Sequence, residues 1–436
     1  MRARIRQFYE DLNDSFWLRP ALIVLAGIAL AEILISIEQS QIIPSGLLSH
    51  WVYSGGETGA RTLLGAVAGS TISVAGTVFS ITIATLTLAS NQMGPRLLRN
   101  FTRDRGNQAT LGIYLGTFAY ALITLRSVQG AEQDAFVPHI AITGAISLSM
   151  LCVVMLVYFV NHVANRINFD TVIELVYADL ARNIEHVTED KAQLTPPPDV
   201  HWQGGTPVTE ERSGYIQQLD EDAIAHWAHC NNTSLRLNAR IGDFVFPGAP
   251  VGIVNPPVSD AEATLRAAMV LGAYPTASLD IEYTVGQLVD IAVRALSPGI
   301  NDPRTAVRVL DRLGAALCEL KGKALATGVV SREGRIVFQR DATTYDGLSD
   351  AMFHAIRQSA AGNVMVLVHM LDVLTKVASA ETDPDRRRTI RHHADLVVED
   401  GLRSVANSAD RLSLSHRQEQ LTAVLESGSA VRRQGD

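Results

Sequence analysis

Polar residues that could act together on one ligand are concentrated in the segment "RALSPGINDPRTA", Arg294 to Ala306. Guanidinium, carboxylate and amide groups at such short spacing can hold an anion or orient a reacting group. With one acidic residue from the preceding turn, the candidate polar cluster consists of Asp290, Arg294, Asn301, Asp302 and Arg304. A catalytic or ligand-binding role for this cluster is one of two interpretations.

The other interpretation of this segment is structural. Ser297-Pro298-Gly299 ends one apolar helix, and Asp302-Pro303 begins the next. Asp at an N-cap accepts hydrogen bonds from the first free amides, and proline at the first helical position lacks only a donor that would be unpaired anyway. Apolar residues then follow in a 3-4 rhythm, at Val307, Leu310, Leu313, Leu317 and Leu320. Local chemistry therefore favours a helical hairpin.

A second set of polar residues lies in the uncharged run "TLLGAVAGSTISVAGTVFSITIATLTLAS", residues 62–90, and just after it. At about 100° per residue, one helix face carries Ser70, Ser73, Thr77, Ser80, Thr87 and Asn91. Such side chains can line a water-filled path, or they can bond to the backbone while the helix packs tightly against neighbours. Gly65-x3-Gly69 favours packing. In a homo-oligomer, one stripe can serve both purposes at different depths.

Four apolar runs have the length and composition of membrane helices: 18–37, 62–90, 109–128 and 138–160. At ~1.5 Å per residue, the second run extends about 43 Å, whereas the hydrocarbon core of a bilayer is ~30 Å thick. It must therefore tilt or project. The N-terminal segment has no small-residue cleavage site, so we expect the first span to be retained. Residues 1–160 are predicted to form a transmembrane domain.

Basic residues at the ends of the spans predict the orientation. They precede the first span and fill the loop after the second, as Arg2, Arg4, Arg6, Arg19, Arg96, Arg99, Arg103 and Arg105. Basic loops stay in the cytoplasm. Both chain ends should therefore be cytoplasmic, together with everything after the fourth span.

The cytoplasmic region is predicted to be α+β, in a protein that is otherwise mainly α-helical. A helical stalk should cover residues 161–190 and a proline-rich linker residues 191–213. Residues 214–256 have the short strands and turns of a small β-barrel. Residues 257–436 should form a helical domain, with two short strands at "GVVSREGRIVFQ" joined by a turn at Glu333-Gly334.

Composition and motifs exclude several classes of function. A net charge of -8 without a dense basic face does not suit a nucleic-acid binder. His226, His229 and Cys230 have metal-like spacing, but no second pair of ligands follows. The sequence has no phosphate-binding glycine loop and no hydrolase or metalloprotease motif. We therefore predict no cofactor and no metal, and an enzyme is not the favoured class.

The segment "GQLVDIAVRALSPGINDPRTAVRVLDRL" resembles the signature of a bacterial family of predicted multi-pass membrane proteins, domain of unknown function 2254. The four spans, the loop "ASNQMGPRLLRNFTRD", the pair Asn161-His162 and the segment "FHAIRQSA" are similar to the same family. The resemblance implies a protein of the bacterial inner membrane with a cytoplasmic C-terminal region. It implies no activity and no catalytic residues.

Three functions remain open from the sequence. We predict a homo-oligomeric channel or transport-like protein in which the second span frames the central path and the cytoplasmic region regulates it. The first alternative is a non-conducting membrane sensor or scaffold, and the second is a membrane-anchored enzyme. The expected partners are the lipid bilayer and further copies of the chain, with an ion or small ligand that the sequence does not identify.

Overall fold

The computed structural model describes residues 16–40, 53–93, 104–128, 136–166, 169–189, 194–274 and 281–433. The chain divides into two compact units at Thr171 and Val172, here called the N-terminal unit and the C-terminal unit. Each unit is described by itself.

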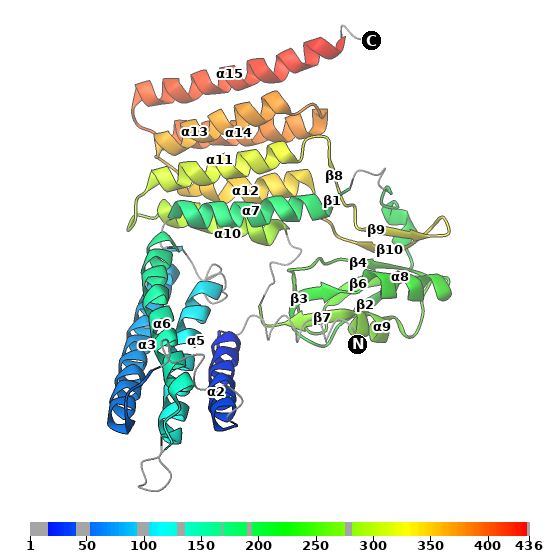
Figure 1. Ribbon diagram of the computed structural model, residues 1–436. Helices are drawn as coiled ribbons and strands as arrows, with labels where there is room; N and C mark the ends of the chain where they lie inside the picture. The colour runs from blue at the N-terminus through cyan, green and yellow to red at the C-terminus, as the bar shows by residue number, and fades with distance from the viewer. Residues whose placement is uncertain are drawn as a thin grey trace. The chain divides into compact units, whose positions relative to one another are not determined.

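The N-terminal unit contains the predicted membrane helices (Figure 1). They are α2 (Leu18–Gln39), α3 (Glu57–Met93), α5 (Arg105–Ser127) and α6 (His139–Arg166). All four are long and apolar enough to cross a membrane, which confirms four helices of spanning length, whereas the bounds of the spans stay a prediction. The helices extend beyond the apolar runs because polar turns continue their backbone hydrogen bonding at the ends.

Helix α5 is the central helix of this unit, because it packs against α2, α3 and α6. Glycines bring α2 and α5 together: a Cβ atom on Gly27 would lie 2.7 Å from the carbonyl oxygen of Gly116. Two tyrosine hydroxyls of α5 donate to backbone oxygens of α6, Tyr114 to Cys152 and Tyr120 to Ala141, each at 2.7 Å. These two hydroxyls of α5 are thus satisfied inside the helix bundle.

Helix α3 contacts α5 and α6 along one face. The buried residues recur every three or four positions, as Ala60, Leu64, Ala68, Thr71, Ala75 and Val78. This spacing defines a single stripe at 3.6 residues per turn. The described residues of this unit leave the opposite face of α3 uncovered.

The helices of the C-terminal unit form a layered bundle, with α15 as its outermost layer (Figure 1). The bundle consists of α7 (Phe169–Val187), α10 (Ile281–Ala295), α11 (Pro303–Glu319), α12 (Tyr345–Ser359), α13 (Val364–Ala380), α14 (Pro384–Ser404) and α15 (Ser408–Arg433). The most apolar of these, α13, packs against α11, α14 and α15. Helix α7, predicted as a stalk, contacts the bundle through Asn183, whose amide donates to the Thr284 hydroxyl at 2.9 Å.

Two sheets form the rest of the C-terminal unit. The five-stranded sheet has the order β2 (Thr206–Thr209), β6 (Pro250–Asn255), β4 (Ser234–Leu237), β10 (Arg335–Arg340) and β9 (Val329–Arg332). The three-stranded sheet has the order β5 (Phe244–Val245), β3 (Gly214–Leu219) and β7 (Met269–Gly272). Their shared core includes Ile216, Leu235 and Phe338, and is covered by α8 (Glu221–Cys230) and α9 (Ala261–Ala268). A short antiparallel ladder joins β1 (Thr188–Glu189) to β8 (Ala324–Leu325), and a 3-10 turn, η2, spans Asp199–Trp202.

The predicted small β-barrel is wrong, because the described strands form open sheets and no closed barrel. Alternation of apolar residues indicates which face of a strand is buried, but it does not determine closure. The decisive strand, β10, comes from residues far along the chain and pairs in parallel with β4, Phe338 opposite Leu235. The predicted hairpin itself is confirmed, with positive φ at Glu333 and Gly334 in its turn.

Candidate functional site

The polar stripe of α3 lies on the face that the described part of the N-terminal unit leaves uncovered. Ser70, Ser73, Thr77, Ser80 and Thr87 are all exposed, whereas Asn91 falls outside the residues whose side chains are described. The glycines on the same side of the helix are open too. A Cβ atom added at Gly65, Gly69 or Gly76 would meet nothing within 4 Å among the described residues, apart from the adjacent backbone of its own helix. We call this combined surface of small and hydroxyl residues the open face of α3.

Hydroxyls on the open face bond to their own helix. Ser73 donates to the Gly69 carbonyl at 2.8 Å, Thr77 to that of Ser73 at 3.2 Å and Thr87 to that of Ile83 at 2.9 Å. These bonds satisfy the hydroxyl donors in any surroundings, while each oxygen keeps acceptor capacity. The face can therefore pack dry against a helix or line water.

The loop between α10 and α11 contains the polar cluster predicted from the sequence. As predicted, Asp302 caps α11, accepting from the amides of Arg304 and Thr305 at 3.2 and 3.3 Å. The Thr305 hydroxyl, 2.6 Å from Asp302 Oδ2, holds the pKa of that carboxyl below its ordinary value, and the two amides add to the effect. Asn301 adopts positive φ in the turn. The cap accounts for Asp302, and a ligand site formed with Asp290, Arg294, Asn301 and Arg304 stays a prediction.

A buried contact between a carboxylate and an imidazole, at one end of the N-terminal unit, was not predicted from the sequence. Asp104 precedes α5 and lies 2.7 Å from Nε2 of His162, near the end of α6. The side chains are 3% and 17% exposed, respectively. Tyr158 stacks on the imidazole, with ring centroids 5.2 Å apart. Gly106 allows this approach, because a Cβ atom there would lie 2.7 Å from His162 Nε2.

More polar side chains are buried beside this pair, in the first turns of α5. Asn107 is 7% exposed, and its Oδ1 has no hydrogen-bond partner among the described residues. Ionisable and polar groups are costly to bury in a membrane protein, so they mark functional candidates. The sequence held a signal for this contact. Asp104 and His162 are the last residues of two segments that resemble the family. A short connection also makes α5 and α6 antiparallel neighbours, which brings the start of α5 near the end of α6.

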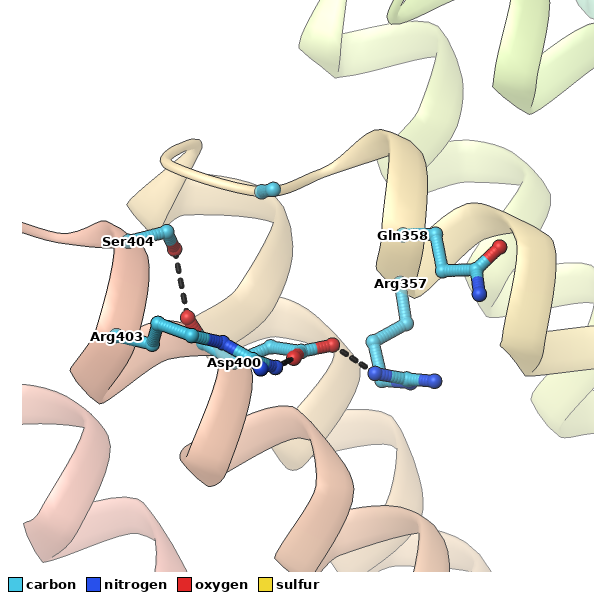
Figure 2. Close-up of a pocket in the computed structure, with 6 residues that line it drawn as sticks. Arg357, Gln358, Asp400, Arg403 and Ser404 are labelled. Carbon is cyan, nitrogen blue, oxygen red and sulfur yellow. Dashed lines mark hydrogen bonds and ion pairs between the residues drawn. The ribbon is translucent and has the colours of Figure 1, made fainter.

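An opening on the C-terminal unit is the second feature not predicted from the sequence (Figure 2). It has a volume of about 400 Å³ and is lined by Arg357, Gln358, Ala361, Asp400, Arg403 and Ser404. Arg357 and Arg403 reach the Asp400 carboxylate from opposite sides. The Arg357 side chain is 8% exposed and that of Arg403 is 69% exposed. Two guanidinium groups therefore share one carboxylate at this opening.

A buried histidine lies near this network. His393 is 1% exposed, packs with its ring 5.6 Å from that of Phe353, and has no hydrogen bond to either ring nitrogen among the described residues. Burial lowers the pKa of His393 to about 4, with Asp350 opposing the shift. The imidazole is therefore neutral at pH 7.

Metal ligands do not gather in the part of the chain that the structure describes, where no group of three His, Cys, Asp or Glu side chains is close enough to hold an ion. Cys230 Sγ lies 3.7 Å from His226 Nε2, both on α8, and His229 faces Glu333 at 3.8 Å. Contacts of this kind are usual between neighbouring side chains on the surface of a helix.

The fold defines a membrane protein with four helices able to span a bilayer and a substantial α+β unit after them. The family described as "Predicted membrane protein (DUF2254)" matches residues 13–376, and the chain belongs to it. Relatives include an uncharacterized protein of Mycobacterium tuberculosis (strain CDC 1551 / Oshkosh) and one of Mycobacterium bovis (strain ATCC BAA-935 / AF2122/97). Each is 31% identical over 98% of this chain and 84% of its own length. No solved structure matches the chain.

Proposed function

We propose that this protein is a homo-oligomeric channel or transport-like protein of the bacterial inner membrane, with both chain ends in the cytoplasm. The open faces of α3 from several copies line or frame a central path. The C-terminal unit lies in the cytoplasm and regulates that path. The passing species is an ion or a small solute.

The open face of α3 is the observation that carries this proposal. The helix buries one stripe against α5 and α6 and turns glycines and hydroxyls outward, together with the large apolar side chains of Ile72, Phe79, Ile81 and Ile83. Lipid gains little from contact with the glycines and hydroxyls of this face, because small and polar side chains offer few apolar atoms. A second helix can pack closely against this face, because glycines allow the two backbones to approach. Water can also contact the face by donating hydrogen bonds to the hydroxyl oxygens.

One copy cannot enclose a path with an outward-facing stripe, so the proposal needs several copies. A ring with cyclic symmetry brings the same face of each copy toward a common axis. Close to the axis the hydroxyls meet water, and at the sides of the helix the glycines meet the next copy. This arrangement explains why polar and small residues share one face.

Conductance of the full-length protein in planar bilayers tests the proposal. The variants Thr77→Leu and Ser80→Leu should strongly reduce or block the current, because they place bulk at the stripe. Ile72→Phe adds bulk to an exposed position beside the stripe and should leave the current unchanged. Assembly of all variants is checked by size before recording. Silent bilayers across several salts and voltages, with correctly assembled protein, contradict conduction.

A non-conducting sensor or scaffold is the second candidate. It is favoured by the hydroxyl bonds within α3, which let the open face form a dry interface between copies. Such a protein would assemble through α3 and capture a partner without flux. A membrane-anchored enzyme would instead require turnover by the full chain that is lost in Arg294→Ala.

A further inference from the structure

We propose that the opening between the ends of α12 and α14 binds a phosphate group, as the free ion or as part of a monoester. Binding there needs no conduction, so the inference stands or falls independently of the proposed channel. The site consists of the six residues that line the opening, Arg357, Gln358, Ala361, Asp400, Arg403 and Ser404.

Charge at the opening favours an anion. The two oxygens of Asp400 are occupied by different guanidinium groups, Oδ2 by Arg357 and Oδ1 by Arg403. The carboxylate is thereby neutralised, and one positive charge remains. Arg403 uses Nη2 for Asp400 and is largely exposed to solvent, so its other N–H groups stay available to a ligand in the opening that it lines. Guanidinium groups match the oxygens of phosphate in pairs.

Arg357 gives the site a rigid, buried cation. Besides Asp400 it contacts His354 Nδ1 through Nη2 at 3.3 Å, while its buried Nε has no hydrogen-bond partner among the described residues. A buried charge with an unused donor is costly unless something compensates it. A bound anion supplies that compensation through its field, without displacing either existing contact.

The contacts of His354 orient Gln358. The guanidinium of Arg357 can only donate, so Nδ1 of His354 accepts and the proton of the neutral ring is on Nε2. The structure places Gln358 Nε2 3.0 Å from His354 Nε2, which would oppose two donors, so we exchange the amide nitrogen and oxygen of Gln358, which are assigned from their partners, and let the oxygen accept. With this assignment, His354 uses neither amide N–H group of Gln358. Because Gln358 lines the opening, these two donors are available to a ligand there.

A tetrahedral phosphate fits these donors better than a flat carboxylate does. The donors come from two helices on different sides of Asp400, and phosphate offers acceptor oxygens in several directions (Figure 2). The volume of about 400 Å³ exceeds what inorganic phosphate needs. Space therefore remains for the organic part of a phosphate monoester.

Equilibrium dialysis of the full-length protein in detergent against radiolabelled inorganic phosphate tests the site directly. Ionic strength is held constant with chloride. We expect saturable binding of one phosphate per chain, weakened at least about tenfold in Arg403→Ala, because a hydrogen bond to a charged group is lost. Gln358→Glu, which puts a carboxylate at the opening at almost constant size, should abolish binding.

Arg388→Ala is the matched control. Arg388 lies on the same helix α14, is exposed, and pairs with Asp385 at the same i,i+3 spacing that joins Arg403 and Asp400. Unchanged binding in this variant supports a local site. Equal weakening in Arg388→Ala and Arg403→Ala, or no saturable binding by the parent chain, overturns the proposal.

Competition distinguishes the two sources of the phosphate group. Displacement of the label by glycerol phosphate at low concentration identifies a soluble ligand. Displacement by dioctanoyl phosphatidic acid, with glycerol phosphate ineffective, identifies a lipid headgroup. Failure of both esters, while inorganic phosphate binds, contradicts the monoester and leaves the free ion as the ligand.

Discussion

His393 is the single residue whose burial most directly predicts a pH response of the C-terminal unit. Its pKa falls from 6.5 to about 4 in the folded protein. Between these values the unfolded chain binds a proton that the folded chain does not, so stability falls as the pH falls. At ~1.4 kcal/mol per pKa unit, the loss reaches about 3 kcal/mol near pH 4.

The variant His393→Leu tests this prediction. It removes the titrating group from an apolar position beside Phe353, so the part of the acid destabilisation that arises between pH 6.5 and 4 should disappear. The measurement is the apparent Tm of the full-length protein in detergent at pH 7 and pH 5. An exposed histidine on the same helix, His392, provides the control His392→Leu. An unchanged pH dependence in His393→Leu contradicts the assignment.

Single residues also show which contacts a sequence can predict. The cap by Asp302 was predictable because N-cap chemistry involves only neighbours in the chain. The contacts of Asp104 with His162 and of Arg357 with Asp400 do not follow from chain neighbours, because they join residues 58 and 43 positions apart. Their partners are selected by helix packing, which no local pattern encodes.

At the scale of elements, the packing of α2 against α5 gives a stability prediction. Gly27→Val should destabilise the protein by about 1–3 kcal/mol, because the new side chain overpacks the contact with Gly116. Gly76→Val, on the open face of α3, should leave the fold of one copy intact, since nothing lies within 4 Å. Thermal unfolding in detergent compares the two. If both variants lower the Tm equally without changing the assembly, Gly76 must be packed within one copy, which contradicts the assignment of the open face of α3.

The elements themselves were predictable to different degrees. Long uncharged apolar runs identify the four spanning helices, because lipid permits little else at that length. The hairpin at Glu333-Gly334 was predictable from turn chemistry. Its position beside β4 was not, because parallel pairing across about a hundred residues leaves no mark in a short segment. The candidate stripe of α3 was visible as a helical period, and its outward orientation required the packing of α5 and α6.

For the whole molecule, the central claim is that copies of the chain meet through the open face of α3. Close approach of identical helices at glycines and small residues is typical of membrane assemblies. A cysteine at Ser73 should then lie near its counterpart in the next copy. In contrast, Val153 of α6 is exposed with large apolar neighbours and should face lipid.

Disulfide cross-linking in native membranes tests this claim most directly. In a chain with the exposed Cys230 and Cys318 replaced by serine, Ser73→Cys should form a covalent dimer on mild oxidation, because a disulfide needs Cα atoms within ~7 Å. Val153→Cys should stay monomeric under the same conditions. Monomeric Ser73→Cys and Gly69→Cys, in protein that is folded and oxidised to completion, would contradict the account.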